Sequence, residues 1–167
     1  MTPIDWEAVQ AVSETLGLII VVSSLIYVGS EVRQNAKATR AAAMNNMMNA
    51  WGDAYRNFGQ SENVGRLVWT GAQNPNELGG ADRWRFSILI AALFHNFQNA
   101  HYQSKLGVYD EDSWAAQSHY LANLMSLPGI RATWDERKEM FSSDFRNFVE
   151  TQILKTPADE NYRLAGT

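Results

Sequence analysis

The feature that most restricts the fold of this chain is an uncharged, apolar segment close to its N-terminus. No Asp, Glu, Lys or Arg occurs between Glu14 and Glu31. A helix of residues 15–30 is roughly 24 Å long at a rise of 1.5 Å per residue. It approaches the ~30 Å hydrocarbon core of a bilayer when Ala11 and Val12 also enter. We therefore predict one transmembrane helix over residues 11–32.

Two other interpretations of this segment remain open. A cleaved signal peptide normally begins with basic residues, whereas Asp5, Glu7 and Glu14 precede this run and no Lys or Arg does. A buried core helix of a soluble protein is also compatible with the composition. The membrane interpretation is favoured because the uncharged run is long.

The distribution of charge around the segment predicts its orientation. Arg33, Lys37 and Arg40 follow the segment directly, and the positive-inside rule places such residues in the cytoplasm. We expect a single-pass protein of the inner (cytoplasmic) membrane, with residues 1–10 in the periplasm and residues 33–156 in the cytoplasm. Anionic headgroups of the membrane lipid would attract the three cations.

One face of the predicted span carries small and polar residues. Gly17, Ser24 and Glu31 are spaced seven residues apart, so they lie on one side of a helix. Small residues allow helices to approach closely in lipid, which predicts an assembly face. The simpler alternative is that glycine and serine are common in membrane spans generally.

The remainder of the chain has the periodicity of an all-α protein, without recognisable β-alternation or internal repeats. The first helix should continue unbroken into the body with an apolar stripe of Ala36, Ala43, Met47, Ala50, Ala54 and Phe58. Further helices are expected over residues 62–72, 82–106, 111–127 and 130–140, and from residue 142 or 143 to 156. The helix at 82–106 is apolar on two faces, which is typical of a helix at the centre of a bundle. Residues 157–167 are expected to form an exposed tail.

Three segments carry a resemblance to a known family. They are residues 31–41; Arg85, Phe86, Phe97, Asn99, Tyr102 and Gln103; and, near the C-terminus, Leu127, Pro128, Gly129, Arg131, Trp134, Arg137, Phe141, Ser142, Phe145, Arg146, Phe148 and Val149. Together they resemble a widespread family of uncharacterised bacterial proteins with one N-terminal transmembrane helix and a cytoplasmic helical domain. The resemblance implies that architecture and brings no known activity.

Composition argues against several classes of function. A net charge of −4 does not suit general nucleic-acid binding. The absence of cysteine excludes disulfides, thiolate metal sites and cysteine nucleophiles. His95, His101 and His119 have no spacing typical of a metal site, and Ser118 next to His119 does not form a triad because adjacent helical side chains diverge. We expect no cofactor, no metal and no catalytic residue.

One polar group in the predicted bundle requires explanation. His95, Asn99, Tyr102 and Gln103 follow one another along the helix at 82–106. Polar groups in a bundle interior must be hydrogen-bonded. These residues are expected either to pair with Arg131 and Asp135, or to line a ligand pocket together with Arg131 and Trp134.

These observations predict a non-enzymatic, membrane-anchored helical assembly protein, either a homo-oligomer or an accessory subunit of a larger membrane complex. The alternative is a membrane-anchored sensor domain that binds a small molecule, and a hydrolase is the least favoured. An assembly protein should expose apolar side chains on its body. A sensor should contain an enclosed cavity with unpaired polar groups. An enzyme should bring titratable groups together in a cleft.

Overall fold

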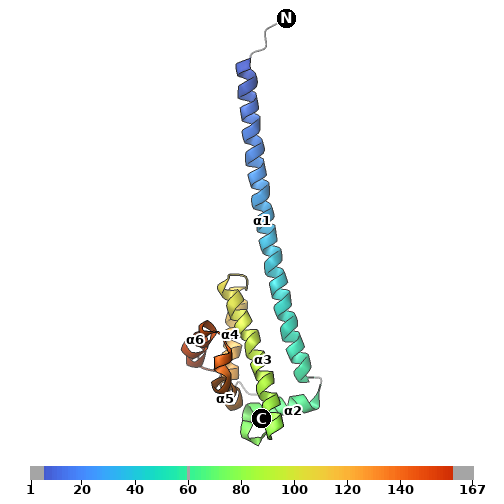
Figure 1. The fold of residues 1–167 in the computed structure, drawn as a ribbon, viewed down its shortest axis with the longest axis vertical. Coiled ribbons are helices and arrows are strands. Elements are labelled where there is room, and N and C mark those ends of the chain that lie inside the picture. The colour runs from blue at the N-terminus through green and yellow to red at the C-terminus, as the bar shows by residue number, and fades with distance from the viewer. Residues whose placement is uncertain (1–5, 60, 160–167) are drawn as a thin grey trace. The chain divides into compact units, whose positions relative to one another are not determined.

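The computed structural model describes residues 6–59 and 61–159, and these residues form helices and no strand (Figure 1). The all-α prediction is confirmed. The α-helices are α1 (Trp6–Gly59), α2 (Glu62–Gln73), α3 (Gly80–Lys105), α4 (Glu111–Met125), α5 (Pro128–Arg137) and α6 (Ser143–Thr151). Three 3₁₀ turns, Pro75–Glu77, Lys138–Met140 and Ile153–Lys155, follow α2, α5 and α6.

The chain divides into two compact units, with the boundary inside α1 between Ala42 and Ala43. In the first unit, every side chain whose burial is described is exposed. Within Ser13–Asp53 this helix is long and apolar enough to cross a membrane, and no part of its most apolar window is buried. The first unit therefore has no core of its own.

The second unit is a helical body that includes the end of α1. Met47 and Trp51 are buried there, and the Trp51 ring lies 4.8 Å from the Phe97 ring of α3 in an edge-to-face arrangement. Of the predicted stripe, Ala43 and Ala50 are half-buried and Ala36 is exposed. The side chains of Ala54 and Phe58 lie outside the described residues. Trp51, one turn after Met47, is the anchor that the predicted stripe omitted.

The close packing of α2 against α5 and α3 depends on two glycines. A β-carbon on Gly129 would lie 1.7 Å from the carbonyl oxygen of Gly71, and one on Gly71 would lie 2.5 Å from the Phe86 ring. Such distances are far inside van der Waals contact, so only glycine permits this approach. Pro128 at the first position of α5 needs no hydrogen-bonded N–H. The helix predicted from residue 130 therefore begins two residues earlier.

Helix α3 is less deeply embedded than its sequence predicts. Phe86, Leu93, Phe97 and Ala100 are buried on one face, as expected. On the second face, which was expected to be buried as well, Ala91 is buried, but Trp84 is 62% exposed and Tyr102 is 61% exposed. That expectation is wrong, because within the body the other helices cover only one side of α3.

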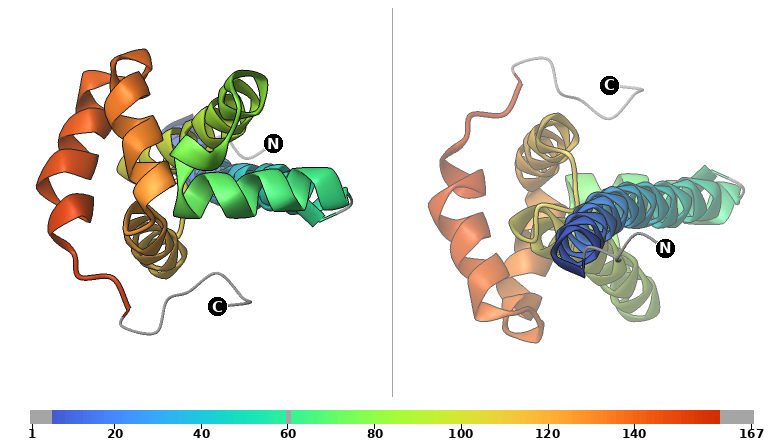
Figure 2. Two further views of the ribbon diagram at one scale, coloured as in Figure 1. Left: turned by 90° about the horizontal axis from the view of Figure 1, so that it is seen from below. Right: turned by 90° about the horizontal axis from the view of Figure 1, so that it is seen from above.

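The C-terminal helices form an aromatic core against α3. The views from below and from above show α5 and α6 side by side and lying across α4 (Figure 2). Trp134 is completely buried, with its ring 5.2 Å from that of Phe94 and 5.4 Å from that of Phe141. Phe145 meets Trp134 edge to face at 5.9 Å. These contacts join α3, α5 and α6 into one core.

Local signals set the helix ends. The Asp110 side chain accepts a hydrogen bond from the Ser113 N–H at 3.0 Å, and Ser142 accepts one from the Phe145 N–H at 3.3 Å. Gly107, which follows α3, has a φ of 65°, a conformation that glycine adopts without strain. The starts of α4 and α6 and the end of α3 therefore coincide with these capping residues.

The segment after α6 is attached to α4 rather than extended. The Asp159 N–H donates to Asn123 Oδ1 at 2.9 Å, and Asn123 Nδ2 donates back to the Asp159 carboxylate at 2.8 Å. His119 Nε2 lies 2.9 Å from the same carboxylate oxygen. Asp159 is exposed, as expected for the tail predicted over residues 157–167, but it is bonded to α4, which the prediction did not include. Residues 160–167 lie outside the described residues.

Candidate functional site

The predicted assembly face of the span lies on the exposed surface of α1. Gly17, Ser24 and Glu31 are all exposed, and a β-carbon on Gly17 would meet nothing within 4 Å. Ser24 Oγ donates to the Ile20 carbonyl at 2.8 Å, and Glu31 accepts from the Tyr27 hydroxyl at 3.0 Å. The polar groups of this face are therefore bonded within their own helix, and Gly17 offers an open approach to the backbone.

Three of the six residues predicted to form a polar pocket are brought together. His95, Asn99 and Tyr102 line an open cavity of about 710 Å³ between α3 and the start of α6. Its wall also includes Gln98, His101, Lys105, Leu106, Ser142 and Asp144. The pocket is a surface hollow and not an enclosed chamber, since His95 and Tyr102 are themselves exposed.

The other three residues do not line this pocket. Gln103 donates to Asn99 Oδ1 at 3.3 Å, while its own Oε1 is buried without a partner among the described residues. Arg131 pairs with Asp135, one turn away on α5, at 3.2 Å. Trp134 is a core residue. Arg131 and Asp135 therefore pair with each other rather than with the polar residues of α3.

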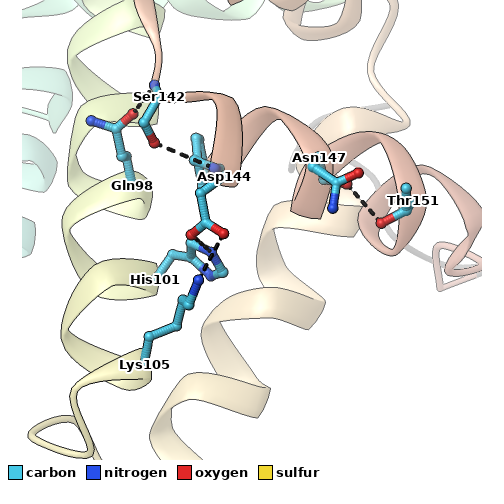
Figure 3. A network of polar contacts seen from close by, with 8 residues as sticks. Gln98, His101, Lys105, Ser142, Asp144, Asn147 and Thr151 are labelled. Atoms are coloured by element: carbon cyan, nitrogen blue, oxygen red, sulfur yellow. Dashed lines mark hydrogen bonds and ion pairs between the residues drawn. The ribbon is translucent and has the colours of Figure 1, made fainter.

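A titratable cluster that the sequence analysis did not single out lies in the pocket wall. His101 Nε2 is 3.1 Å from Asp144 Oδ2, and Lys105 Nζ donates to Asp144 Oδ1 at 2.7 Å. Figure 3 shows His101 and Lys105 reaching from α3 toward Asp144 in the first turn of α6. Gln98 accepts a hydrogen bond from the Ser142 N–H at 2.8 Å. Together these bonds attach the start of α6 to α3.

The environment of His101 favours its neutral form. Its ring stacks on Phe148 at 4.5 Å and lies 5.5 Å from Trp114. Burial lowers the pKa of His101, and the hydrogen bond to Asp144 opposes that effect only in part. The hydrogen bond from Lys105, followed by that from His101, lowers the pKa of Asp144. A neutral imidazole that donates from Nε2 to Asp144 satisfies this geometry.

The contacts of this cluster are those of a structural link between α3 and α6. His101 Nδ1 is buried and has no hydrogen-bond partner among the described residues. The Ser142 hydroxyl is engaged in capping α6. The signal in the sequence was the pair His101 and Lys105, one turn apart, but the sequence did not show that Asp144 would lie opposite. Within residues 6–59 and 61–159, no three His, Asp or Glu side chains converge to hold a metal ion.

The face of α3 that the other helices of the body leave uncovered is exposed to solvent. We call the exposed residues Ile88, Ala92, His95, Asn99, Tyr102 and Leu106 the α3 ridge. The 710 Å³ pocket lies against its C-terminal half. A second open cavity of about 760 Å³ lies between α2 and α3, at the N-terminal end of the α3 ridge. Trp84 and Ile88 are among the residues that line it.

Comparison with known proteins leaves the chain to be interpreted from its own residues. No protein-family model, no curated protein and no solved structure matches it.

Proposed function

We propose that this protein is a membrane-anchored, non-enzymatic helical assembly protein. The observation that carries the proposal is the complete exposure of the apolar run in α1. Its exposed side chains include Leu16, Leu18, Ile19, Ile20, Val21, Val22, Leu25, Ile26 and Val28. Burying one such side chain stabilises a protein by about 1.5–3 kcal/mol, so leaving all of them in water forgoes an amount comparable to the ~5–15 kcal/mol stability of a whole domain.

The arrangement of these side chains supports lipid as the medium that covers them. Residues 18 to 22 are consecutive, and five consecutive helical residues point in all directions around the axis. A helix that pairs in water needs only one apolar stripe. An apolar surface on all sides is typical of a helix surrounded by hydrocarbon.

Charge supports the proposed orientation. Arg33, Lys37 and Arg40 are exposed and form no ion pair with any other described residue. Their excess on one side of the run favours a cytoplasmic body and a periplasmic N-terminus in the inner membrane. They remain available to phosphate groups of membrane lipid.

Assembly is favoured over ligand sensing because polar side chains of the pocket are already hydrogen-bonded and apolar side chains of α3 are exposed. A single span cannot by itself form a transport path, so any part in transport would require other subunits. The body exposes aromatic and aliphatic side chains on α3, which is expected of a protein with a partner. In the pocket of the alternative sensor function, Gln98, His101 and Lys105 are already bonded to α6. The partner is a second copy or a larger membrane complex, and no activity or cofactor is part of the proposal.

Membrane extraction tests the anchor. The full-length protein should sediment with membranes and stay there in high salt and in alkaline carbonate. A variant without residues 1–30 should move to the soluble fraction. Full-length protein that is soluble without detergent would contradict the anchor.

A reporter fusion tests the orientation. A C-terminal phosphatase that is active only in the periplasm should remain silent, whereas the same reporter joined to the C-terminus through an added second span, which carries it into the periplasm, provides the positive control. Activity of the C-terminal fusion would reverse the proposed topology.

Size analysis in mild detergent tests assembly. Gly17→Leu should leave insertion intact and shift the protein to smaller species, because it separates helix backbones that pack at this face. Gly29→Leu is the matched control: Gly29 is also an open, exposed glycine of the span but lies on another side of the helix. A wild-type protein that is monomeric and retains no partner would contradict assembly.

A further inference from the structure

The residues of the α3 ridge have the spacing of a coiled-coil seam. Residues 88, 92, 95, 99, 102 and 106 are separated alternately by four and three positions. This is the a/d pattern that pairs two helices along a common line. In most globular helices such a line faces the core, but here all six residues are exposed. Helix α3 therefore has a second face suited to packing that its own body leaves uncovered.

The chemistry of the ridge suits a second copy of the same chain. Its residues carry no acidic or basic group other than the imidazole of His95, so two copies can approach without strong like-charge repulsion. The nearest cation, Lys105, is held by Asp144, and Arg85 lies 3.6 Å from Asp82. A charged partner would find no complementary patch along this line.

Asn99 gives the ridge a self-complementary centre. In a symmetric pair, a residue on the two-fold axis meets its own counterpart. An asparagine amide offers both donors and an acceptor, so two copies of Asn99 can bond to each other. A single asparagine at an a position is also the residue that sets register in two-stranded coiled coils.

We propose that two copies of this protein pair through the α3 ridge, with the two α3 helices parallel and in register and Asn99 opposite Asn99. This inference rests on the proposed function, since anchoring in one membrane confines all copies to one plane and brings their bodies together. Tyr102 and Leu106 then pack against their counterparts on one side of Asn99, and Ile88 on the other.

The exposed area of the ridge is too small for stable pairing in solution, so pairing depends on the membrane anchor. Tyr102 is 61% exposed, Leu106 58% and Ile88 40%. Because a whole aromatic side chain buries ~150–250 Å², the ridge offers on the order of 500 Å² per copy, less than the roughly 800 Å² per partner of a standard stable interface. Confinement to a bilayer raises the effective concentration of the bodies, and a weak contact then suffices.

The absence of cysteine from the chain permits a direct test. Single-cysteine variants Asn99→Cys and Tyr102→Cys of the full-length protein would be reconstituted in liposomes and treated with a mild oxidant. The matched control is Ala116→Cys, at an exposed position of α4 outside the ridge. We expect at least fivefold more disulfide-linked dimer at positions 99 and 102 than at 116, on non-reducing gels. Equal yields at all three positions would overturn the proposal.

A second experiment separates this inference from the proposed function. Asn99→Lys puts two like charges at the centre of the interface without touching the core, so the body should melt as in the wild type while energy transfer between labelled copies in liposomes falls severalfold. If the wild type is oligomeric and Asn99→Lys leaves the energy transfer unchanged, pairing through the α3 ridge is wrong, and the proposed assembly must use another face. A wild type that is monomeric in liposomes would overturn both.

Discussion

Gly129 in α5 lies directly against the backbone carbonyl of Gly71 in α2, so close that a β-carbon on Gly129 would be 1.7 Å from that oxygen. A β-carbon on Gly129 would clash with the main chain of Gly71, so no change of side-chain rotamer could relieve the clash. The contact fixes the distance between two helices that are more than fifty residues apart in sequence.

Gly129→Ala should therefore destabilise the body strongly, by about 3 kcal/mol or more, at the upper end of the cost of overpacking. Gly80→Ala is the control, since Gly80 begins α3 and a β-carbon there meets nothing within 4 Å. Thermal or denaturant melting of the two variants measures the difference. A Gly129→Ala variant as stable as the wild type would show that α2 and α5 do not cross in this way.

Trp134→Ala and Phe145→Ala should each lower the free energy of unfolding by about 3–5 kcal/mol, the usual cost of emptying a buried aromatic site. Both side chains are 0% exposed and their rings are in contact. Trp84→Ala removes the same kind of ring from a site that is 62% exposed, and should cost less than about 1 kcal/mol. Chemical denaturation of the three variants distinguishes core from surface, and equal losses would contradict the assignment.

Acidification should destabilise the body through His101. Burial lowers the pKa of His101 below its ordinary value of 6.5, so as pH falls through 6.5 the unfolded chain takes up a proton that the folded protein resists. Stability is then lost with falling pH in this range. His101→Asn should give a flatter dependence of stability on pH than the wild type, and His95→Asn controls for the loss of an exposed histidine. A wild-type stability that rises on acidification through pH 6.5 would contradict the burial of this ring.

Asn123→Ala should release the segment at Asp159 from α4 and cost about 1–2 kcal/mol, since it removes two hydrogen bonds of a buried side chain. Amide hydrogen exchange at Asp159 should become faster in this variant. The bonds from Asn123 and His119 lower the pKa of Asp159 below its ordinary 3.8, so the contribution of the carboxylate is complete above pH 3.8 and is lost as pH falls through the lowered pKa, while the backbone bond to Asn123 does not titrate. Unchanged exchange at Asp159 would show that the segment is held by other contacts.

Much of the fold was predictable because its signals are local. The uncharged run, the capping residues Asp110 and Ser142 and the glycine after α3 all act within one or two helical turns. Periodicity identified the buried face of α3 from Phe86 to Ala100. These features depend on neighbouring residues alone, and the all-α class follows from them.

The sequence by itself determined where the helices lie, which helix is long and apolar enough to cross a membrane, and which residues begin and end the helices of the body. Tertiary structure alone decided which of the two apolar faces of α3 would be covered, that Asp144 would meet His101 and Lys105, and that Gly129 would meet Gly71. It also placed Trp134 in the core, away from the pocket in which the sequence expected it. The physical reason is that helix formation is governed by residues within a few positions of each other. Burial and pairing depend on which distant segments pack together. The hydrophobic effect is not directional, so it favours the burial of apolar surface without selecting which segments bury it against each other.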